Sequence, residues 1–352
     1  MLTSCARLLS RSLLERYVVL TVTNMYIGSF NQDQVLKRLD GEDKSCIYSA
    51  RDLQVFMIPV SGSLFMFPGE DVKNFLRMAY EFLSELPNII VSEDVCSIVV
   101  FGSAARPSDF VPGVSDIDVL VLVKRAPKRR VYNLDFMDTR VHVELFTPDE
   151  LDQMIEKGSP LGFMLRYSVV LLDRGCLSMI RSRPRITEYT IKILRRSVLA
   201  ALGLAIESYY MEMPRKSASH LYHSIRHLIR YLYSLSGDAE GFPVSDEELL
   251  SRSPEDLRSF FKKLIEMRRR EIDVNELREA IEETIELITE KLCLKKTGID
   301  ALERLPSKPL IVVACENDNW LVFHVEIASE AGLKKLRLRG ADVIEIENIL
   351  CD

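Results

Sequence analysis

The fold of this chain is decided by Ile98-Val99-Val100-Phe101-Gly102-Ser103 and by Ser115-Asp116-Ile117-Asp118-Val119-Leu120-Val121-Leu122-Val123. Each stretch joins an apolar run to a polar turn, which predicts two buried strands. Side chains two residues apart on a strand point to the same face, so we expect Asp116 and Asp118 to lie side by side. Neighbouring carboxylates repel each other unless a cation lies between them. The pattern therefore indicates the kind of Mg²⁺ site that phosphoryl or nucleotidyl transfer requires.

Together these residues resemble the nucleotidyltransferase superfamily, which includes DNA polymerase beta, the aminoglycoside nucleotidyltransferases and the minimal nucleotidyltransferases of archaea and bacteria. The family pattern is an apolar strand, Gly-Ser, a short helix, Asp-x-Asp on the next strand and a third acidic residue on a later strand. The resemblance covers roughly residues 70 to 175. It departs from the pattern at Arg106, which is followed by Pro107 where the minimal enzymes have glycine, and in a slightly longer loop before Ser115.

The third acidic residue is expected on the segment Thr139–Phe146, which follows a basic loop at residues 124–130. Alternation along this segment puts Val141, Val143 and Leu145 on one face and His142 and Glu144 on the other. The resemblance implies that Glu144 is the third acid, with His142 as its rival. If neither residue lies near the two aspartates, the domain would bind a nucleotide without turning it over.

The resemblance implies a reaction in which a hydroxyl group attacks the α-phosphorus of an NTP and pyrophosphate leaves. Asp116 and Asp118 would hold one or two Mg²⁺ ions, or Mn²⁺, that bridge the triphosphate. Glu144 would bind the second metal ion or take the proton from the attacking hydroxyl. These three residues are the predicted catalytic and metal-binding set, and ATP is the expected NTP.

Four further residues are predicted to bind the nucleotide: Gly102, Ser103, Arg106 and Ser115. Gly102 lets the backbone approach the phosphates, and the Ser103 hydroxyl lies where the N–H groups of the next helix start. Arg106 is one turn further on, where it either pairs with a phosphate oxygen or lies on a solvated helix face. Ser103 and Asp116 also have simpler interpretations, as a helix N-cap and a turn cap.

The composition limits the partners and the location of the protein. With 46 Lys and Arg against 52 Asp and Glu, the net charge is −6, which argues against a dedicated nucleic-acid surface. The basic loop at 124–130 is either a solvated connection or a site for a triphosphate or an acidic partner. The 7 cysteines include no Cys-x-x-Cys, so no zinc site or disulfide framework is readable and a cytoplasmic location is expected. No apolar run is long enough for a membrane span, and residues 1–16 are interpreted as an amphipathic helix rather than a transit peptide.

A chain of 352 residues is expected to hold more than one domain. We predict an α/β (α+β) nucleotidyltransferase core with a mixed sheet, followed by an all-α helical bundle and a small α+β tail. The predicted domains are an N-terminal α+β extension at 1–67, the core at 68–178, the bundle at 186–297 and the tail at 306–352. Three local predictions within them are a helix that starts with the capping sequence Thr147-Pro148-Asp149-Glu150, a helix N-cap at Ser253 and a short helix near Ala328–Leu336.

The predicted bundle resembles the substrate domain of the aminoglycoside enzymes and the HEPN-type domains that accompany minimal nucleotidyltransferases. HEPN ribonucleases carry an Arg and a His separated by four to six residues, a spacing that Arg215 and His220 match. His220, His223 and His227 lie at helical spacing and share one face. We interpret this row as a polar groove or packed surface rather than as a metal site.

We therefore expect a Mg²⁺-dependent nucleotidyltransferase with a small hydroxylated molecule, a protein side chain or an RNA end as acceptor. The helical domain is the expected surface for a second copy of the chain or a partner protein, and no membrane contact is expected. The alternatives are an antitoxin-like regulatory transferase that acts on a partner protein, a non-catalytic nucleotide-binding module, and an RNA-directed terminal nucleotide adder.

Overall fold

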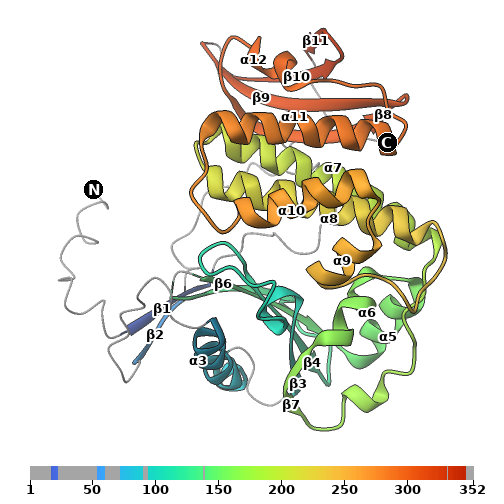
Figure 1. Cartoon of the computed structure of the whole chain (residues 1–352). Helices are drawn as coiled ribbons and strands as arrows, with labels where there is room; N and C mark the ends of the chain where they lie inside the picture. The colour runs from blue at the N-terminus through green and yellow to red at the C-terminus, as the bar shows by residue number, and fades with distance from the viewer. Residues whose placement is uncertain are drawn as a thin grey trace, which may run out of the picture. The chain divides into compact units, whose positions relative to one another are not determined.

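The computed structural model of the chain describes residues 17–22, 54–59, 72–89, 94–137, 139–330 and 332–345. These residues fall into two compact units, one around the sheet of the predicted core and one around the predicted helical bundle (Figure 1). The first unit takes in the described residues up to 155 together with 164–183, and the second takes in 156–163 and 184–345. The amphipathic helix expected within residues 1–16 lies outside the described residues, and the four predicted domain boundaries stay predictions.

The first unit is built on a five-stranded mixed sheet with the strand order β5-β6-β4-β3-β7. Its strands are β3 (Val95–Phe101), β4 (Ile117–Val123), β5 (Val131–Phe136), β6 (Thr139–Phe146) and β7 (Val169–Asp173). β4 pairs with β6 in parallel, whereas the pairs β3–β4, β3–β7 and β5–β6 are antiparallel. The mixed sheet predicted for the core is confirmed, and β5 is a strand that we did not predict.

The two faces of this sheet differ in what covers them. α3 (Val72–Ser84) buries Phe75, Leu76, Ala79 and Leu83 in one core with Ile117, Val119 and Val121 of β4 and Val141, Val143 and Leu145 of β6. Because side chains alternate along a strand, Asp118, His142 and Glu144 belong to the opposite face. The core packing of α3 thus decides which face of the sheet carries the polar residues.

Short elements complete the first unit. They are β1 (Tyr17–Val22) paired antiparallel with β2 (Gln54–Pro59), and α4 (Leu86–Ile89), η1 (Gly102–Ala105), α5 (Pro148–Lys157), α6 (Pro160–Met164), η2 (Leu165–Tyr167) and η3 (Leu177–Met179). α5 begins with the predicted capping sequence, because the Thr147 hydroxyl accepts from Glu150 N and the Glu150 carboxylate accepts from Thr147 N. Of these elements, α6 lies mostly in the second unit, together with the last two residues of α5.

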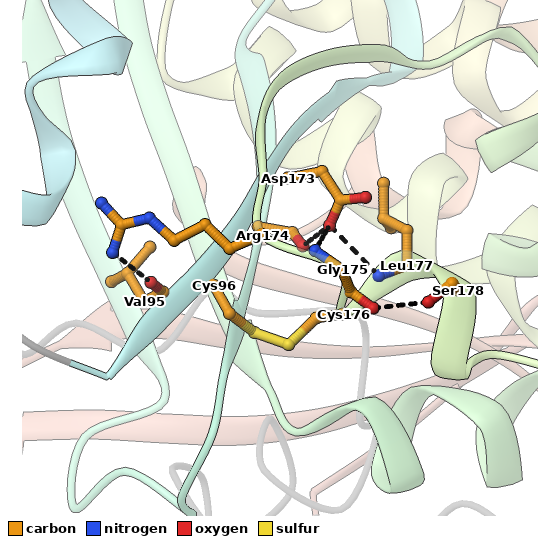
Figure 2. The surroundings of a disulfide bond; sticks show 9 residues. Val95, Cys96, Asp173, Arg174, Gly175, Cys176, Leu177 and Ser178 are labelled. Atoms are coloured by element: carbon orange, nitrogen blue, oxygen red, sulfur yellow. Dashed lines mark hydrogen bonds between the residues drawn. A yellow bond between two sulfur atoms is a disulfide. The ribbon is translucent and has the colours of Figure 1, made fainter.

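A disulfide joins Cys96 at the start of β3 to Cys176 after β7 (Figure 2). The same edge of the sheet is held by Arg174 N donating to Cys96 O at 2.7 Å and by Ser97 Oγ donating to Asp173 Oδ1 at 2.7 Å. This disulfide was not readable from the spacing of the cysteines, because strand pairing brings together residues 80 positions apart in sequence. The predicted cytoplasmic location loses this support and stays a prediction.

The described residues of the second unit form a bundle of five main helices, and the helical bundle predicted to follow the core is confirmed. They are α7 (Glu188–Tyr210), α8 (Pro214–Ser234), α9 (Asp246–Arg252), α10 (Glu255–Met267) and α11 (Val274–Lys291). The predicted N-cap at Ser253 was wrong: Ser253 ends α9, where its hydroxyl donates to Leu249 O, and Pro254 precedes α10. The helix α9 had no apolar stripe long enough to reveal it in the sequence.

The tail of the chain is an antiparallel sheet that shares its core with the helices. Its strands follow one another in the order β8 (Pro309–Asn317), β9 (Trp320–Ser329), β10 (Gly332–Arg339) and β11 (Asp342–Glu345), after the short helix α12 (Ile299–Glu303). The helix predicted near Ala328–Leu336 was wrong, because Leu336 and Leu338 alternate with charged residues at the spacing of a strand. Gly203 of α7 allows close contact with β8, since a Cβ there would lie 2.8 Å from Val312 O.

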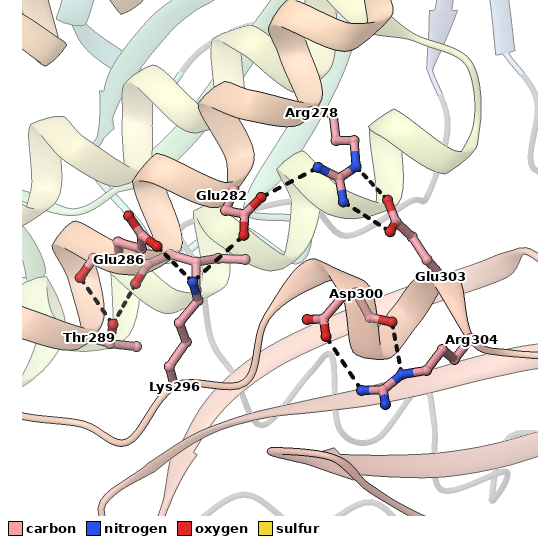
Figure 3. A network of polar contacts seen from close by, with 9 residues as sticks. Arg278, Glu282, Glu286, Thr289, Lys296, Asp300, Glu303 and Arg304 are labelled. Atoms are coloured by element: carbon pink, nitrogen blue, oxygen red, sulfur yellow. Dashed lines mark hydrogen bonds and ion pairs between the residues drawn. The ribbon is translucent and has the colours of Figure 1, made fainter.

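A polar network holds α12 and the segment before it against α11 (Figure 3). The Arg278 guanidinium contacts both carboxylate oxygens of Glu303, and Lys296 Nζ lies 2.8 Å from Glu286 Oε1. These residues are largely exposed, so we assign them little net stability. These contacts instead help to position the segment that leads from the helices into the tail sheet.

His220, His223 and His227 lie on α8, as predicted from their spacing. Burial, and then the charge of Lys216, lower the pKa of His220 to about 4. Burial, followed by neighbouring arginines, holds the pKa of His223 and of His227 well below the usual range. The three imidazoles are therefore neutral at pH 7, and protonating any of them opposes folding.

We predict that removing the disulfide with Cys96→Ser/Cys176→Ser lowers the free energy of unfolding by up to about 4 kcal/mol, the loop-closure value for a loop of this size. Urea unfolding of the first unit measures it, with Cys293→Ser, which removes an exposed free cysteine, as the matched control. A reducing agent should lower the stability of the wild type and leave the double variant unchanged. Equal stability of the two proteins under oxidising conditions would contradict this.

We predict that the second unit loses stability as the pH falls from 7 to 5. The folded-state pKa values of the three histidines lie below the unfolded value of about 6.5, so the unfolded chain binds more protons in this range. The stability is complete above about pH 6.5 and declines as the pH approaches 4. Melting followed by the helical circular dichroism signal should show Tm falling by several degrees, and His220→Asn should flatten this dependence. An unchanged pH dependence in the variant would count against buried neutral imidazoles.

Candidate functional site

The predicted Gly-Ser turn lies at the end of β3, where η1 begins with Gly102. Gly102 has φ +70°, a backbone conformation that favours glycine. A Cβ added at this position would lie 2.6 Å from Asp118 Oδ2, so the carboxylate would have to shift. Glycine therefore suits this position for two reasons, the sign of φ and the close approach of a predicted metal-binding carboxylate.

Tyr80 of α3 supports this turn from the core side. Its hydroxyl donates to Ala104 O at 2.6 Å, which fixes a carbonyl inside η1. Burial raises the pKa of the Tyr80 hydroxyl, so it stays a donor at any physiological pH. The sequence analysis missed Tyr80, although its position directly after the buried Ala79 marks it as a residue at the edge of the helix's apolar face.

The predicted acidic residues lie on the face of the sheet opposite α3. Asp118 pairs with His142 in the parallel register of β4 and β6, and Glu144 pairs with Leu120, two positions further along. Asp116 directly precedes β4 and is exposed, whereas Asp118 and Glu144 are half-buried. In this register His142, rather than Glu144, lies directly beside Asp118 on the neighbouring strand.

His142 connects the members of this group. Its Nε2 lies 3.1 Å from Glu144 Oε1 and its Nδ1 lies 2.9 Å from Asn133 Oδ1 on β5. Both partner atoms are acceptors, so an imidazolium with two N–H donors satisfies both. Burial alone would lower the pKa of His142, but the hydrogen bond and charge of Glu144 and the charges of Asp118 and Asp116 outweigh it and raise the pKa.

The carboxylates of Asp116, Asp118 and Glu144 all act on the charge of His142, and carboxylate oxygens are the ligands that Mg²⁺ prefers. In the described part of the chain, however, no three His, Cys, Asp or Glu side chains are arranged to hold one metal ion. The donor types thus fit a hard cation at Asp116 and Asp118, while Glu144 is directed to His142. The two rivals for the third position are hydrogen-bond partners of each other.

The remaining predicted nucleotide-binding residues have defined local contacts. Arg106 is buried, with Nε 2.6 Å from Asp109 Oδ2, so it does not lie on a solvated helix face. Its Nη1 is buried and has no hydrogen-bond acceptor among the described residues. Ser115 is buried and its Oγ accepts from Val111 N at 3.0 Å, which shapes the loop before Asp116. Ser103 is half-buried at the start of η1.

The HEPN-like pair lies in the second unit. Arg215 is exposed in the first turn of α8, and His220 is half-buried one to two turns further on. The nuclease interpretation of this pair stays a prediction. Separately, no helix among the described residues is long and apolar enough to cross a membrane.

Comparison with known proteins gives one match that bears on function. Residues 83–170 match the family model described as the nucleotidyltransferase domain. This region contains β3, η1, β4, β5 and β6, and with them the Gly-Ser turn and all of the predicted acidic residues. No curated protein matches the chain significantly.

Two solved structures are similar at a low level. One is a nucleotidyltransferase-like protein from Exiguobacterium sibiricum 255-15, with 13% identity, a TM-score of 0.28 and coverage of 67% of this chain and 81% of that one. The other is an aminoglycoside 6-adenyltransferase from Bacillus subtilis, with 12% identity, a TM-score of 0.20 and coverage of 62% and 92%. Similarity at this level carries no argument about activity or substrate.

The family match covers one part of the chain, which contains the Gly-Ser turn and the Asp-x-Asp strand. The resemblance predicted from the Gly-Ser turn and the Asp-x-Asp strand is confirmed, and its core is the mixed sheet around β4 and β6. Residues 83–170 of this chain are a nucleotidyltransferase domain.

Proposed function

We propose that this protein transfers a nucleotidyl group from an NTP to a hydroxyl acceptor and releases pyrophosphate. The observation that carries the proposal is the close approach of position 102 to the Asp118 carboxylate within residues that match the nucleotidyltransferase domain: a Cβ there would lie 2.6 Å from Asp118 Oδ2. A Gly-Ser turn next to an acidic group suits a nucleoside triphosphate and its cation, because the turn can bind phosphates and the carboxylate can bind the cation.

Asp116 and Asp118 would hold Mg²⁺, which supplies charge neutralisation of the triphosphate when it is bound. In this proposal the Gly102 turn and Ser103 bind the phosphates, and Arg106 uses its buried Nη1 as a further donor. Asp109 keeps Arg106 in place through the bond to Nε. ATP is the proposed NTP, and the acceptor is a small molecule, a protein or an RNA end.

The role of Glu144 depends on its hydrogen bond to His142. As a transferase residue, Glu144 would leave His142 and accept the proton of the attacking hydroxyl. The bond as it stands favours a second candidate function, a module that binds a nucleotide without transferring it. The two candidates differ in the expected effect of changing Glu144.

We predict that Asp118→Asn lowers nucleotidyl transfer at least 100-fold, because it removes the charge that binds the cation next to the Gly102 turn. Purified protein is incubated with Mg²⁺, each α-labelled NTP and candidate acceptors, and the label on protein, RNA and small molecules is counted. Asp149→Asn, an exposed aspartate on α5, is the matched control and should retain full activity. Transfer by wild type that survives in Asp118→Asn would overturn the assigned site.

The same assay separates the two candidate functions. A transferase should lose at least tenfold in kcat with Glu144→Gln while its thermal stability stays close to that of the wild type. A binding module should show no transfer in any variant, yet should bind NTP in a Mg²⁺-dependent way that Asp118→Asn abolishes.

We predict that Gly102→Ala lowers kcat/KM at least tenfold and Gly113→Ala does not. Both glycines have a positive φ, so both changes cost about 1 kcal/mol of stability through backbone strain. Only the Cβ at position 102 meets Asp118, while the Cβ at position 113 meets nothing within 4 Å. Steady-state kinetics and melting temperatures of the pair test this, and equal activity losses would show that strain, rather than the Asp118 contact, matters.

A further inference from the structure

One face of α8 carries a row of nitrogen-bearing side chains that the nucleotidyltransferase domain does not use. It consists of His220, His223, Arg226 and His227, here called the α8 row, and all four are half-buried. They lie at helical spacings of three and four, and the row runs for about 10 Å along the helix. The His220 and His223 rings have centroids 6.5 Å apart.

The α8 row has donors that the described part of the protein does not satisfy. Arg226 Nε and His227 Nδ1 are buried and have no hydrogen-bond partner there. None of the four side chains forms an ion pair with a carboxylate of the described residues. A buried guanidinium N–H without an acceptor is unfavourable, so this face is suited to a group that brings acceptors and negative charge.

The surroundings of the row are also basic. The Arg226 and Arg268 guanidinium carbons lie 5.3 Å and 3.9 Å from the centroid of the Tyr222 ring, which stacks on Phe261 of α10. The Tyr222 hydroxyl donates to Asp246 Oδ1 of α9 at 2.5 Å. Asp246 therefore directs one carboxylate oxygen to Tyr222 rather than to the α8 row.

The electrostatics of the imidazoles agree with this geometry. Burial is the largest cause of the lowered pKa of each, and the charges of Lys216, Arg226, Arg230 and Arg268 add to it. Carboxylates are not among the causes for any of the three. The row therefore combines one fixed cation with three neutral N–H donors, and it repels further cations.

We propose that the α8 row binds a phosphoryl group of an anionic ligand. A tetrahedral oxyanion accepts hydrogen bonds in several directions, which matches a guanidinium flanked on the same helix face by imidazoles. A planar carboxylate matches a single guanidinium well but leaves the imidazoles on either side unused. The site lies wholly within the second unit and does not depend on metal or nucleotide at the Asp118 site.

Sulfate is the probe, because it has the shape of a phosphoryl group and does not titrate between pH 6 and 8. The protein has 5 histidines, so their ring C–H signals can be followed individually by NMR. Sulfate should shift the signals of His220, His223 and His227 with one shared Kd, while His324, which is buried in β9, serves as the reference. Sodium chloride at equal ionic strength is the control for screening.

Arg226→Gln should weaken sulfate binding at least tenfold. Arg215→Gln, which removes an exposed arginine from the same helix, is the matched control and should bind like the wild type. If Arg226→Gln does not fold, as judged by the His324 signal and melting, His223→Asn takes its place with an expected loss of at least threefold. Equal Kd values for wild type and the folded variant would overturn the proposal, as would shifts that chloride reproduces.

The pH dependence gives a second readout. A bound anion raises the pKa of the imidazoles, so sulfate affinity should increase at least threefold from pH 8 to pH 6. The charged groups that act on the imidazoles besides Arg226 are Lys216, Arg230 and Arg268, and the nearby Tyr222 hydroxyl donates to Asp246. Affinity that decreases from pH 8 to pH 6 would contradict binding of the anion by the imidazoles. Because no nucleotide or metal is present, these results stand whether or not the protein transfers nucleotides.

Discussion

The close approach of position 102 to the Asp118 carboxylate is the constraint on which the rest of the site depends. It follows from the pairing of β3 with β4, which is antiparallel and puts Phe101 opposite Asp118. A Cβ at position 102 would force this carboxylate to shift, so the glycine preserves its position. α3 then fixes the turn from behind, through the Tyr80 hydroxyl and the apolar residues that bury β3 and β4. The packing of α3 on the sheet therefore both forms the core of the first unit and sets the geometry of its site.

The features that could be predicted from the sequence depend on residues that lie close together in the chain. Alternation in Thr139–Phe146 separated His142 and Glu144 from the core face, and the structure has this division. The Gly-Ser turn and the Asp-x-Asp strand predicted the nucleotidyltransferase domain, because glycine and paired carboxylates at this spacing have few other uses. The caps of α5 were readable for the same reason, since each depends on residues within one turn.

The features that the sequence did not predict depend on contacts between distant residues. Cys96 and Cys176 become neighbours only through the pairing of β3 with β7. The segment near Ala328–Leu336 has charges that suit a helix as well as a strand, and pairing with β9 decides in favour of the strand. The contact of Tyr80 with Ala104 likewise joins residues that only the packing of α3 brings together. Local patterns contain no information about such partners.

The hydrogen bond between His142 and Glu144 explains why the third position of the site was hard to assign. Asp116, Asp118 and Glu144 together raise the pKa of His142, so the cluster already attracts one positive charge. A metal ion at the two aspartates would compete with that imidazolium, because both are stabilised by the same carboxylates. Binding of the cation should therefore favour the neutral form of the His142 imidazole and weaken its hydrogen bond to Glu144. On this argument His142 and Glu144 are not alternatives for one role: the charge of His142 determines when Glu144 is available.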